Sequence, residues 1–177
     1  TLLRFFQQGG ILCSNKDARD HFHFSLERMA LGGVFDAVHG GFSRYAVDAE
    51  WHIPHFEKMG YDNGQLISLY AQAHREEPKA LYQETIDKTI SFLKKELYTP
   101  EGGFYAALDA DSLNANQKLV EGAFYVWTKN EIQELFPKEY LQVAAYYAIN
   151  DDGYWEDGNY VLRRMQTEEV FAKLHGL

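Results

Sequence analysis

A short segment of the chain concentrates side chains that can transfer protons or bind anions: His55, Glu57, Lys58 and Asp62. Because proline suits the first turn of a helix, we expect a helix to begin at Pro54. His55, Lys58 and Asp62 would then share one face. In that arrangement Asp62 or Glu57 would be a general acid or base, His55 would share the proton transfer, and Lys58 would bind a hydroxyl or carboxylate group. The alternative is a structural Lys58–Asp62 ion pair beside a helix cap.

A second pair of carboxylates, Asp109 and Asp111, follows an expected strand at 104–108. Side chains two residues apart in an extended chain point to the same side. Glycoside hydrolysis uses two carboxyl groups, one to protonate the leaving oxygen and one to activate water or to attack. The alternatives are an acidic turn and a weak calcium site.

Aromatic residues are abundant, since 12 Tyr, 12 Phe and 3 Trp make up 15% of the chain. Apolar walls with a few directed polar groups are typical of small-molecule sites, and aromatic ring faces suit the C–H faces of sugars. The alternative is that these rings fill gaps between helices. The candidate substrate-binding residues are Arg44, Tyr45, Trp51, Lys58, Asn63, Tyr105, Tyr125 and Trp127, and the wider aromatic set adds Phe42, Phe104 and Trp155.

The spacing of histidine and cysteine does not predict a metal or redox centre. His52, His55 and Glu57 offer nitrogen and oxygen donors, but Pro54 interrupts a helical presentation and no H-E-x-x-H motif is present. The single cysteine, Cys13, cannot form an intrachain disulfide and is expected to be a small buried residue. We therefore expect neither a metal nor a cofactor.

The elements that must position these residues are mainly helical. Apolar residues recur with helical spacing over 16–31, 54–75 and 79–97, and the short break at Pro78 predicts that the last two of these helices pack antiparallel. Thr128 and Glu131 form a capping-box pattern. The other expected elements are a helix ending at Gly9-Gly10, helices at 128–136, 138–148 and from 167, and a two-stranded ribbon of 104–108 with 123–127.

The charge balance narrows the classes of partner. Seventeen Lys and Arg residues against 26 Asp and Glu residues give a net charge of −9, and no basic block is present. This argues against nucleic acid and against an anionic membrane surface as partners. No apolar segment approaches the roughly 18 residues of a membrane helix, and no signal pattern is seen at the N-terminus. We expect a soluble, cytoplasmic protein.

Glycine–aromatic pairs recur along the chain, each at the end of an expected helical pair: Gly41-Phe42, Gly103-Phe104 and Gly153-Tyr154. Recurrence at the length of one helix pair plus a loop is typical of repeat architectures whose loops lie on one face. The pattern predicts an α/α toroid or solenoid with short β-ribbons in the inter-helix loops.

The run from Trp51 to Met59, W-x-x-P-H-F-E-K-M, together with EGGFYAALDADS at 101–112 and EGAFYVWT at 121–128, resembles the YyaL-like proteins, also called spermatogenesis-associated thioredoxin-domain proteins. The resemblance implies an N-terminal thioredoxin-like domain joined to an (α/α)6 toroid similar to six-hairpin glycosidases and N-acylglucosamine 2-epimerases. This sequence departs from the family pattern at His39, Gly60 and Gly64, and a glycine inside a helix costs about 1 kcal/mol relative to alanine.

Six hairpins of about 50 residues would need about 300 residues. We therefore expect residues 1–177 to hold about half of one toroid domain, with the thioredoxin-like domain and the remaining hairpins outside this chain. By analogy of fold, the expected function is glycoside hydrolysis or sugar epimerisation by acid/base catalysis on a small carbohydrate. The alternative is a non-catalytic binding or scaffold module that accompanies the thioredoxin-like domain. Facing carboxyl groups roughly 5–10 Å apart would favour the enzyme.

Overall fold

The chain folds into seven α-helices and four pairs of short antiparallel strands within residues 2–176, the part that this computed structural model describes. The prediction of a mainly helical chain with short strand pairs is confirmed. The helices are α1 (Leu2–Leu12), α2 (Lys16–Leu31), α3 (Gly60–Glu76), α4 (Ala80–Phe92), which continues into a π-helical turn at Leu93–Leu97, α5 (Lys129–Leu135), α6 (Tyr140–Tyr146) and α7 (Glu168–His175). The strands are β1 (Tyr45–Ala46), β2 (Pro54–His55), β3 (Lys58–Met59), β4 (Ala107–Leu108), β5 (Asp111–Leu113), β6 (Leu119–Glu121), β7 (Val126–Thr128) and β8 (Asn159–Val161).

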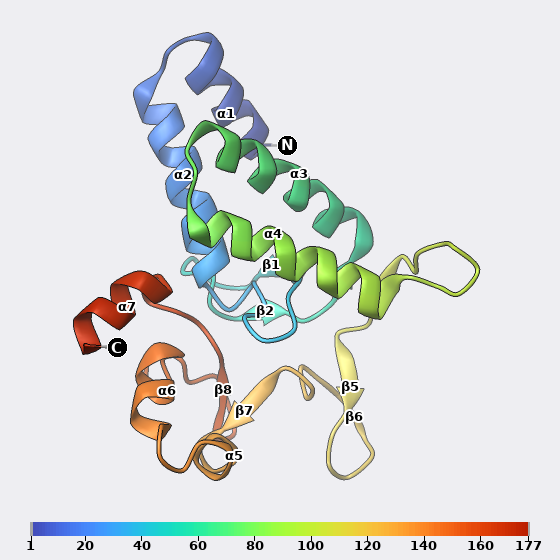
Figure 1. The fold of residues 1–177 in the computed structure, drawn as a ribbon. Helices are drawn as coiled ribbons and strands as arrows, with labels where there is room; N and C mark the ends of the chain where they lie inside the picture. Colours follow the sequence, from blue (N-terminus) through green and yellow to red (C-terminus); the bar gives the residue numbers. More distant parts are fainter. Residues whose placement is uncertain (1, 177) are drawn as a thin grey trace.

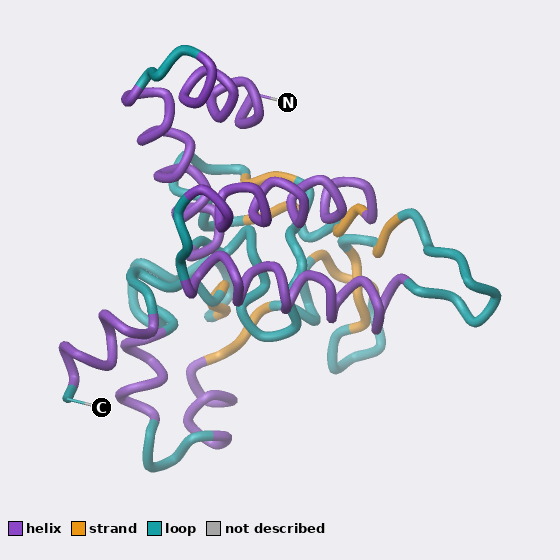
Figure 2. The backbone as a smooth tube through the Cα atoms, turned by 45° about the horizontal axis from the view of Figure 1, so that its top comes forward, coloured by secondary structure: helices purple, strands orange, loops and turns teal. Residues whose placement is uncertain are grey.

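Two helical hairpins, α1–α2 and α3–α4, form the larger half of the molecule (Figure 1). α3 and α4 lie side by side and antiparallel in both views, as their short connection predicted (Figure 2). Phe22 and Leu26 of α2 are fully buried against Tyr70 of α3 and Tyr82 of α4. The helical spacing of the apolar residues in α2 therefore places one face of that helix in the main core.

Gly9 and Gly10 do not end the first helix, which continues to Leu12. A Cβ atom built at Gly10 would lie 3.0 Å from the Cβ of Arg19. The glycine pair therefore allows α1 to approach α2 closely, so its role is packing between helices rather than helix termination.

The segment 54–59 is extended, so the prediction that a helix begins at Pro54 is wrong. β2 pairs with β1, which places His55 opposite Tyr45, and β3 pairs with β4, which places Lys58 opposite Leu108. α3 begins only at Gly60. The first pairing closes the loop between residues 46 and 54, and the second joins residues far apart in the sequence. Together they hold the segment extended before the helix can start.

The predicted ribbon of 104–108 with 123–127 is also wrong, because each segment has another partner. β4 pairs with β3, β7 pairs with β8, and the hairpin between them is β5–β6. The capping box at Thr128 is confirmed: its hydroxyl accepts the N–H of Glu131, and the Glu131 carboxylate accepts the N–H of Thr128. α5 starts where the sequence pattern placed it.

The C-terminal third has a small core of its own, built on Ile132, Ile149, Tyr160 and Leu162. Arg164 joins it to the helical hairpins, since its guanidinium donates to Glu84 of α4 at 2.9 Å and to the carbonyl of Ala30 in α2 at 3.2 Å. Within the described residues no helix has the length and apolar character needed to cross a bilayer.

Replacing Gly64 by alanine is expected to raise the free energy of unfolding by about 1 kcal/mol, because Gly64 lies inside α3 and no atom lies within 4 Å of an added Cβ. Urea denaturation measures the change. The contrasting substitution is Gly122→Ala, since Gly122 has φ +72° and its Cβ would lie 2.5 Å from the Phe56 ring. That variant should lose stability, and a loss in Gly64→Ala would contradict the helical assignment of this position.

Candidate functional site

The candidate site lies where the long loop 32–59 reaches the first turn of α3. The pairing of β1 with β2 stacks the Tyr45 ring on the His55 ring, with centroids 5.0 Å apart and planes 18° from parallel. The backbone N–H of Arg44 donates to the carbonyl of Glu57 at 2.8 Å. This local strand pairing brings together four of the candidate residues that the sequence analysis named.

The imidazole of His55 lies between two carboxylates. Its Nδ1 is 2.9 Å from Oε1 of Glu121, and its Nε2 is 3.9 Å from Oε2 of Glu57. The same Glu57 oxygen accepts a hydrogen bond from the Arg44 guanidinium at 2.9 Å. An imidazole placed between two carboxylates can accept a proton on one side and release one on the other.

Glu121 is a site residue that the sequence analysis missed. It reaches His55 across 66 positions of the chain, from the end of β6. No local sequence pattern predicts a contact between residues so far apart in the chain. The only signal was that Glu121 opens the EGAFYVWT run on which the family resemblance rests.

Asp62 lies in the first turn of α3, near both Arg44 and Glu57. Partial burial raises the pKa of the Asp62 carboxyl above its ordinary value, the Arg44 charge opposes this rise, and the Glu57 charge adds to it. A carboxyl group that keeps its proton more readily is suited to act as an acid, whereas Glu57 is held by a guanidinium. The two carboxyl groups therefore have different environments.

A cleft of about 620 Å³ opens beside Asp62, between the α1–α2 hairpin and α3. This volume falls in the range of small-molecule sites. Arg44, Tyr45, Trp51 and Asp62 all line the cleft. Trp51 has φ 60° in the turn that follows Asp48, whose carboxylate accepts the N–H groups of Glu50, His52 and Ile53. The carboxylate of Asp48 fixes the turn and thereby places Trp51 in the wall.

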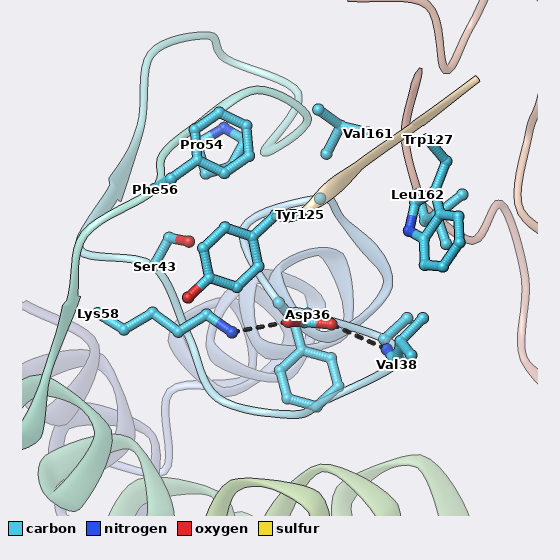
Figure 3. Close-up of a pocket in the computed structure, with 13 residues that line it drawn as sticks. Asp36, Val38, Ser43, Pro54, Phe56, Lys58, Tyr125, Trp127, Val161 and Leu162 are labelled. Carbon is cyan, nitrogen blue, oxygen red and sulfur yellow. Dashed lines mark hydrogen bonds and ion pairs between the residues drawn. The ribbon is translucent and has the colours of Figure 1, made fainter. Parts of the chain in front are cut away.

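Lys58 does not share a face with His55 and Asp62. Its side chain is 1% exposed, and Nζ lies 2.8 Å from Oδ2 of Asp36 (Figure 3). Nζ also donates to the carbonyl oxygen of Gly40 at 3.0 Å. Neighbouring residues of an extended chain point to opposite sides, so Lys58 turns inward. The helical face predicted for this group and the alternative Lys58–Asp62 ion pair are both wrong, and the ionic partner of Lys58 is Asp36.

Tyr125 and Trp127 line a small cavity beside Lys58 (Figure 3). Its volume of about 30 Å³ is room for a water molecule rather than a sugar. The Tyr125 ring stacks on Phe56 and lies 4.5 Å from Nζ of Lys58, and burial raises the pKa of Tyr125 to about 12. The Tyr125 ring packs against the buried ion pair, Trp127 packs against the C-terminal core, and neither ring lines the cleft.

The other predicted residues lie outside the cleft. Asn63 is fully buried, and its side chain bonds the backbone N–H and carbonyl of Phe42. Tyr105 lines a separate apolar hollow with Tyr61 and Phe104. Cys13 is exposed, so the prediction of a buried thiol is wrong.

Asp109 and Asp111 are exposed, and Oδ1 of Asp109 accepts the N–H of Asp111 at 3.0 Å, which is the geometry of an acidic turn. Asp111 is nevertheless the strand partner of Glu121 in the β5–β6 hairpin. The pair of Asp109 and Asp111 therefore lies close to Glu121, the carboxylate that contacts His55. Among residues 2–176 no cluster of three His, Cys, Asp or Glu side chains is arranged to hold a metal ion.

Comparison with known proteins supports the family resemblance. The chain is 39% identical over 181 residues to an uncharacterized protein of Caenorhabditis elegans, an alignment that covers 90% of this chain and 25% of that protein. It is 43% identical over 118 residues to spermatogenesis-associated protein 20 of Homo sapiens, covering 66% of this chain and 15% of that protein. The Mus musculus protein of the same name is 44% identical over 115 residues, or 64% of this chain and 15% of that protein.

No family model matches the chain. The chain spans a quarter or less of the length of these relatives. The similarity supports the family of spermatogenesis-associated protein 20 for the aligned part of the chain.

Proposed function

We propose that the chain, as a part of an α/α toroid of this family, carries an acid/base site that acts on a carbohydrate by glycoside hydrolysis or epimerisation. The observation that carries the proposal is the position of His55 between Glu57 and Glu121, with Asp62 at the edge of a cleft of about 620 Å³. Acidic groups in different environments beside an aromatic wall are what such chemistry requires.

A recurring way of closing the loops supports the toroid part of the proposal. Each glycine–aromatic pair closes its loop through an isolated antiparallel bridge to a second aromatic residue, and the three bridges are Phe35–Phe42, Tyr98–Phe104 and Tyr154–Tyr160. The first two of these loops follow the adjacent hairpins α1–α2 and α3–α4. A recurring loop closure after successive helix pairs is the pattern of a helical repeat.

In this proposal Asp62 donates a proton to the leaving oxygen of a glycoside, or to the sugar carbon in an epimerisation. Glu57 lies beside the cleft rather than in its lining, so it would receive the proton that water or the substrate loses through an intervening water molecule, and His55 would pass it on toward Glu121. Arg44 holds Glu57 in place through their hydrogen bond. Tyr45 and Trp51 present ring faces to the sugar.

Replacing Glu57 by glutamine is expected to lower turnover about a hundredfold or more, because the amide cannot accept the proton. The assay uses the longest natural form of the protein on a panel of mono- and oligosaccharides, with release of reducing ends measuring hydrolysis and proton NMR measuring epimerisation. The matched control is Glu134→Gln, an exposed carboxylate on α5 away from the cleft. Turnover of no sugar, or equal turnover by both variants, would refute the proposal.

A second candidate function, a non-catalytic binding or scaffold role, is favoured by a separate observation. Glu57 is bound to Arg44, and Asp109 caps its own turn, so both carboxylates already have structural partners. This is the arrangement of a non-catalytic binding or scaffold module that accompanies a thioredoxin-like domain. Sugar binding without turnover by the full-length protein would support this second function.

A further inference from the structure

The lining of the cleft beside Asp62 holds two guanidinium groups, although the chain has a net charge of −9. Arg4 and Arg44 line it, with His21 nearby in the same wall. Among the residues described, Asp62 is the only acidic side chain that lines this cleft. Glu57 balances the charge of Arg44 from outside the lining, so an anionic ligand is favoured here by the guanidinium N–H donors at the cleft rather than by a net positive charge.

The Arg44 guanidinium carries more N–H donors than its hydrogen bond to Glu57 uses. Its guanidinium carries five N–H donors, and within residues 2–176 its side chain bonds one partner, Glu57, through a single nitrogen. The side chain is 47% exposed, so the remaining donors are open to solvent at the cleft. A planar guanidinium with free donors matches the geometry of a carboxylate, which it binds through two parallel hydrogen bonds.

The Asp62 carboxyl group also lines the cleft. Burial raises its pKa above its ordinary value, so its ionised form is less favoured in the native state than in water. A bound anion would raise the pKa of Asp62 further, in the direction that the proposed acid role needs.

We propose that the substrate of this site is a sugar that carries a carboxylate, bound with its carboxylate on Arg44 and its ring against Trp51 and Tyr45. The inference rests on the proposed function for the chemistry and adds the substrate class. Arg4 also lines the cleft and contributes positive charge there, so its role is attraction rather than a defined contact.

The test compares glucuronate with glucose, which differ at C6, by calorimetric titration and NMR saturation transfer on the longest natural form of the protein. Glucuronate should bind about tenfold more tightly, the size expected for hydrogen bonds between charged groups. Arg44→Gln should reduce the preference to within about twofold, and Arg4→Gln should reduce it partly. The matched control Arg75→Gln, at an exposed position in the last turn of α3, should leave it unchanged.

The outcomes separate this inference from the proposed function. Equal binding of the two sugars, tighter binding of glucose 6-phosphate than of glucuronate, or a preference that survives Arg44→Gln overturns the carboxylate inference. Turnover of neutral glycosides as fast as glucuronides overturns it while the proposed function stands. Tight, Arg44-dependent binding of glucuronate without turnover of any sugar supports the carboxylate site and refutes the proposed function. If Arg44→Gln fails to fold, Arg4→Gln and the loss of preference at high salt decide the question.

Discussion

Replacing Asp36 by alanine is expected to lower the free energy of unfolding by about 3–5 kcal/mol, because it leaves the Lys58 ammonium group buried without its counter-charge. Lys58 is 1% exposed, and its Nζ lies 2.8 Å from the Asp36 carboxylate. The rings of Phe92 and Tyr125 lie 4.8 and 4.5 Å from Nζ. They offer weak cation–π stabilisation, which cannot replace an anion.

The Asp36→Asn variant tests the charge of Asp36 separately from the hydrogen bonds that its side chain accepts in the local turn. Oδ1 of Asp36 accepts the N–H groups of Val38 at 3.0 Å and His39 at 2.9 Å, and an asparagine side chain can still accept them. Asn should therefore cost less than Ala but still leave Lys58 unpaired. The double variant Asp36→Asn with Lys58→Met should recover much of the loss, since it removes both charges.

The pH dependence of the variant has a definite sign. Burial lowers the pKa of Lys58 below its ordinary value of 10.5, and Asp36 opposes this effect. Without Asp36 the pKa in the native state falls further, whereas the unfolded chain keeps its ordinary pKa. Between these two pKa values the unfolded state binds more protons, so the stability of the variant rises with pH. Its deficit relative to the native chain should therefore shrink from pH 7 to pH 9.

Urea denaturation at pH 7 and pH 9 measures these effects. Asp87→Asn, an exposed carboxylate on α4, serves as the control and should change stability by no more than about 0.5 kcal/mol. A loss below about 1 kcal/mol for Asp36→Ala, with no dependence on pH, would show that the ion pair does not support the loop.

The helices could be predicted from the sequence because their signals are local. The apolar spacing of Phe22, Leu26 and Met29 gave α2 its bounds, and Thr128 with Glu131 gave the start of α5. The segment 54–59 could not be predicted in this way. Pro54 suits both a helix start and a strand at the edge of a sheet. Pairing decides between them, with 45–46 across one loop and with 107–108, which is distant in the sequence.

The candidate site was predicted in its residue types but not in its geometry. His55 and Glu57 lie on one side because they are two residues apart in an extended chain, and Lys58 turns to the buried side for the same reason. A helical spacing would have grouped Lys58 with His55 instead. Glu121 could not be found because its contact with His55 depends on where the β5–β6 hairpin lies in the fold.

Replacing Asp62 by asparagine is expected to lower turnover about a hundredfold while leaving stability unchanged or raised. Turnover falls because the amide cannot donate the proton that the proposed acid supplies. Stability is kept because burial, which raises the pKa of Asp62, disfavours the ionised carboxylate relative to the protonated, uncharged form. Asparagine resembles that form in shape and charge.

The sign of the stability change in Asp62→Asn follows from the raised pKa of Asp62. Between the ordinary pKa of 3.8 and the raised native pKa, the native state binds more protons than the unfolded chain, so stability falls as pH rises through that window. Above it the ionised carboxylate opposes folding, and asparagine removes that cost. The advantage of the variant should therefore be present at pH 7 and absent below the ordinary pKa.

Steady-state kinetics and urea denaturation on the same preparations measure both effects, with Asp87→Asn as the control for a charge change outside the cleft. A structural role predicts that activity and stability fall together, because a paired carboxylate stabilises its neighbours. A catalytic role predicts that turnover falls while stability is kept. Unchanged turnover would remove Asp62 from the proposed mechanism, and a joint loss would assign it to the structural network of Arg44 and Glu57.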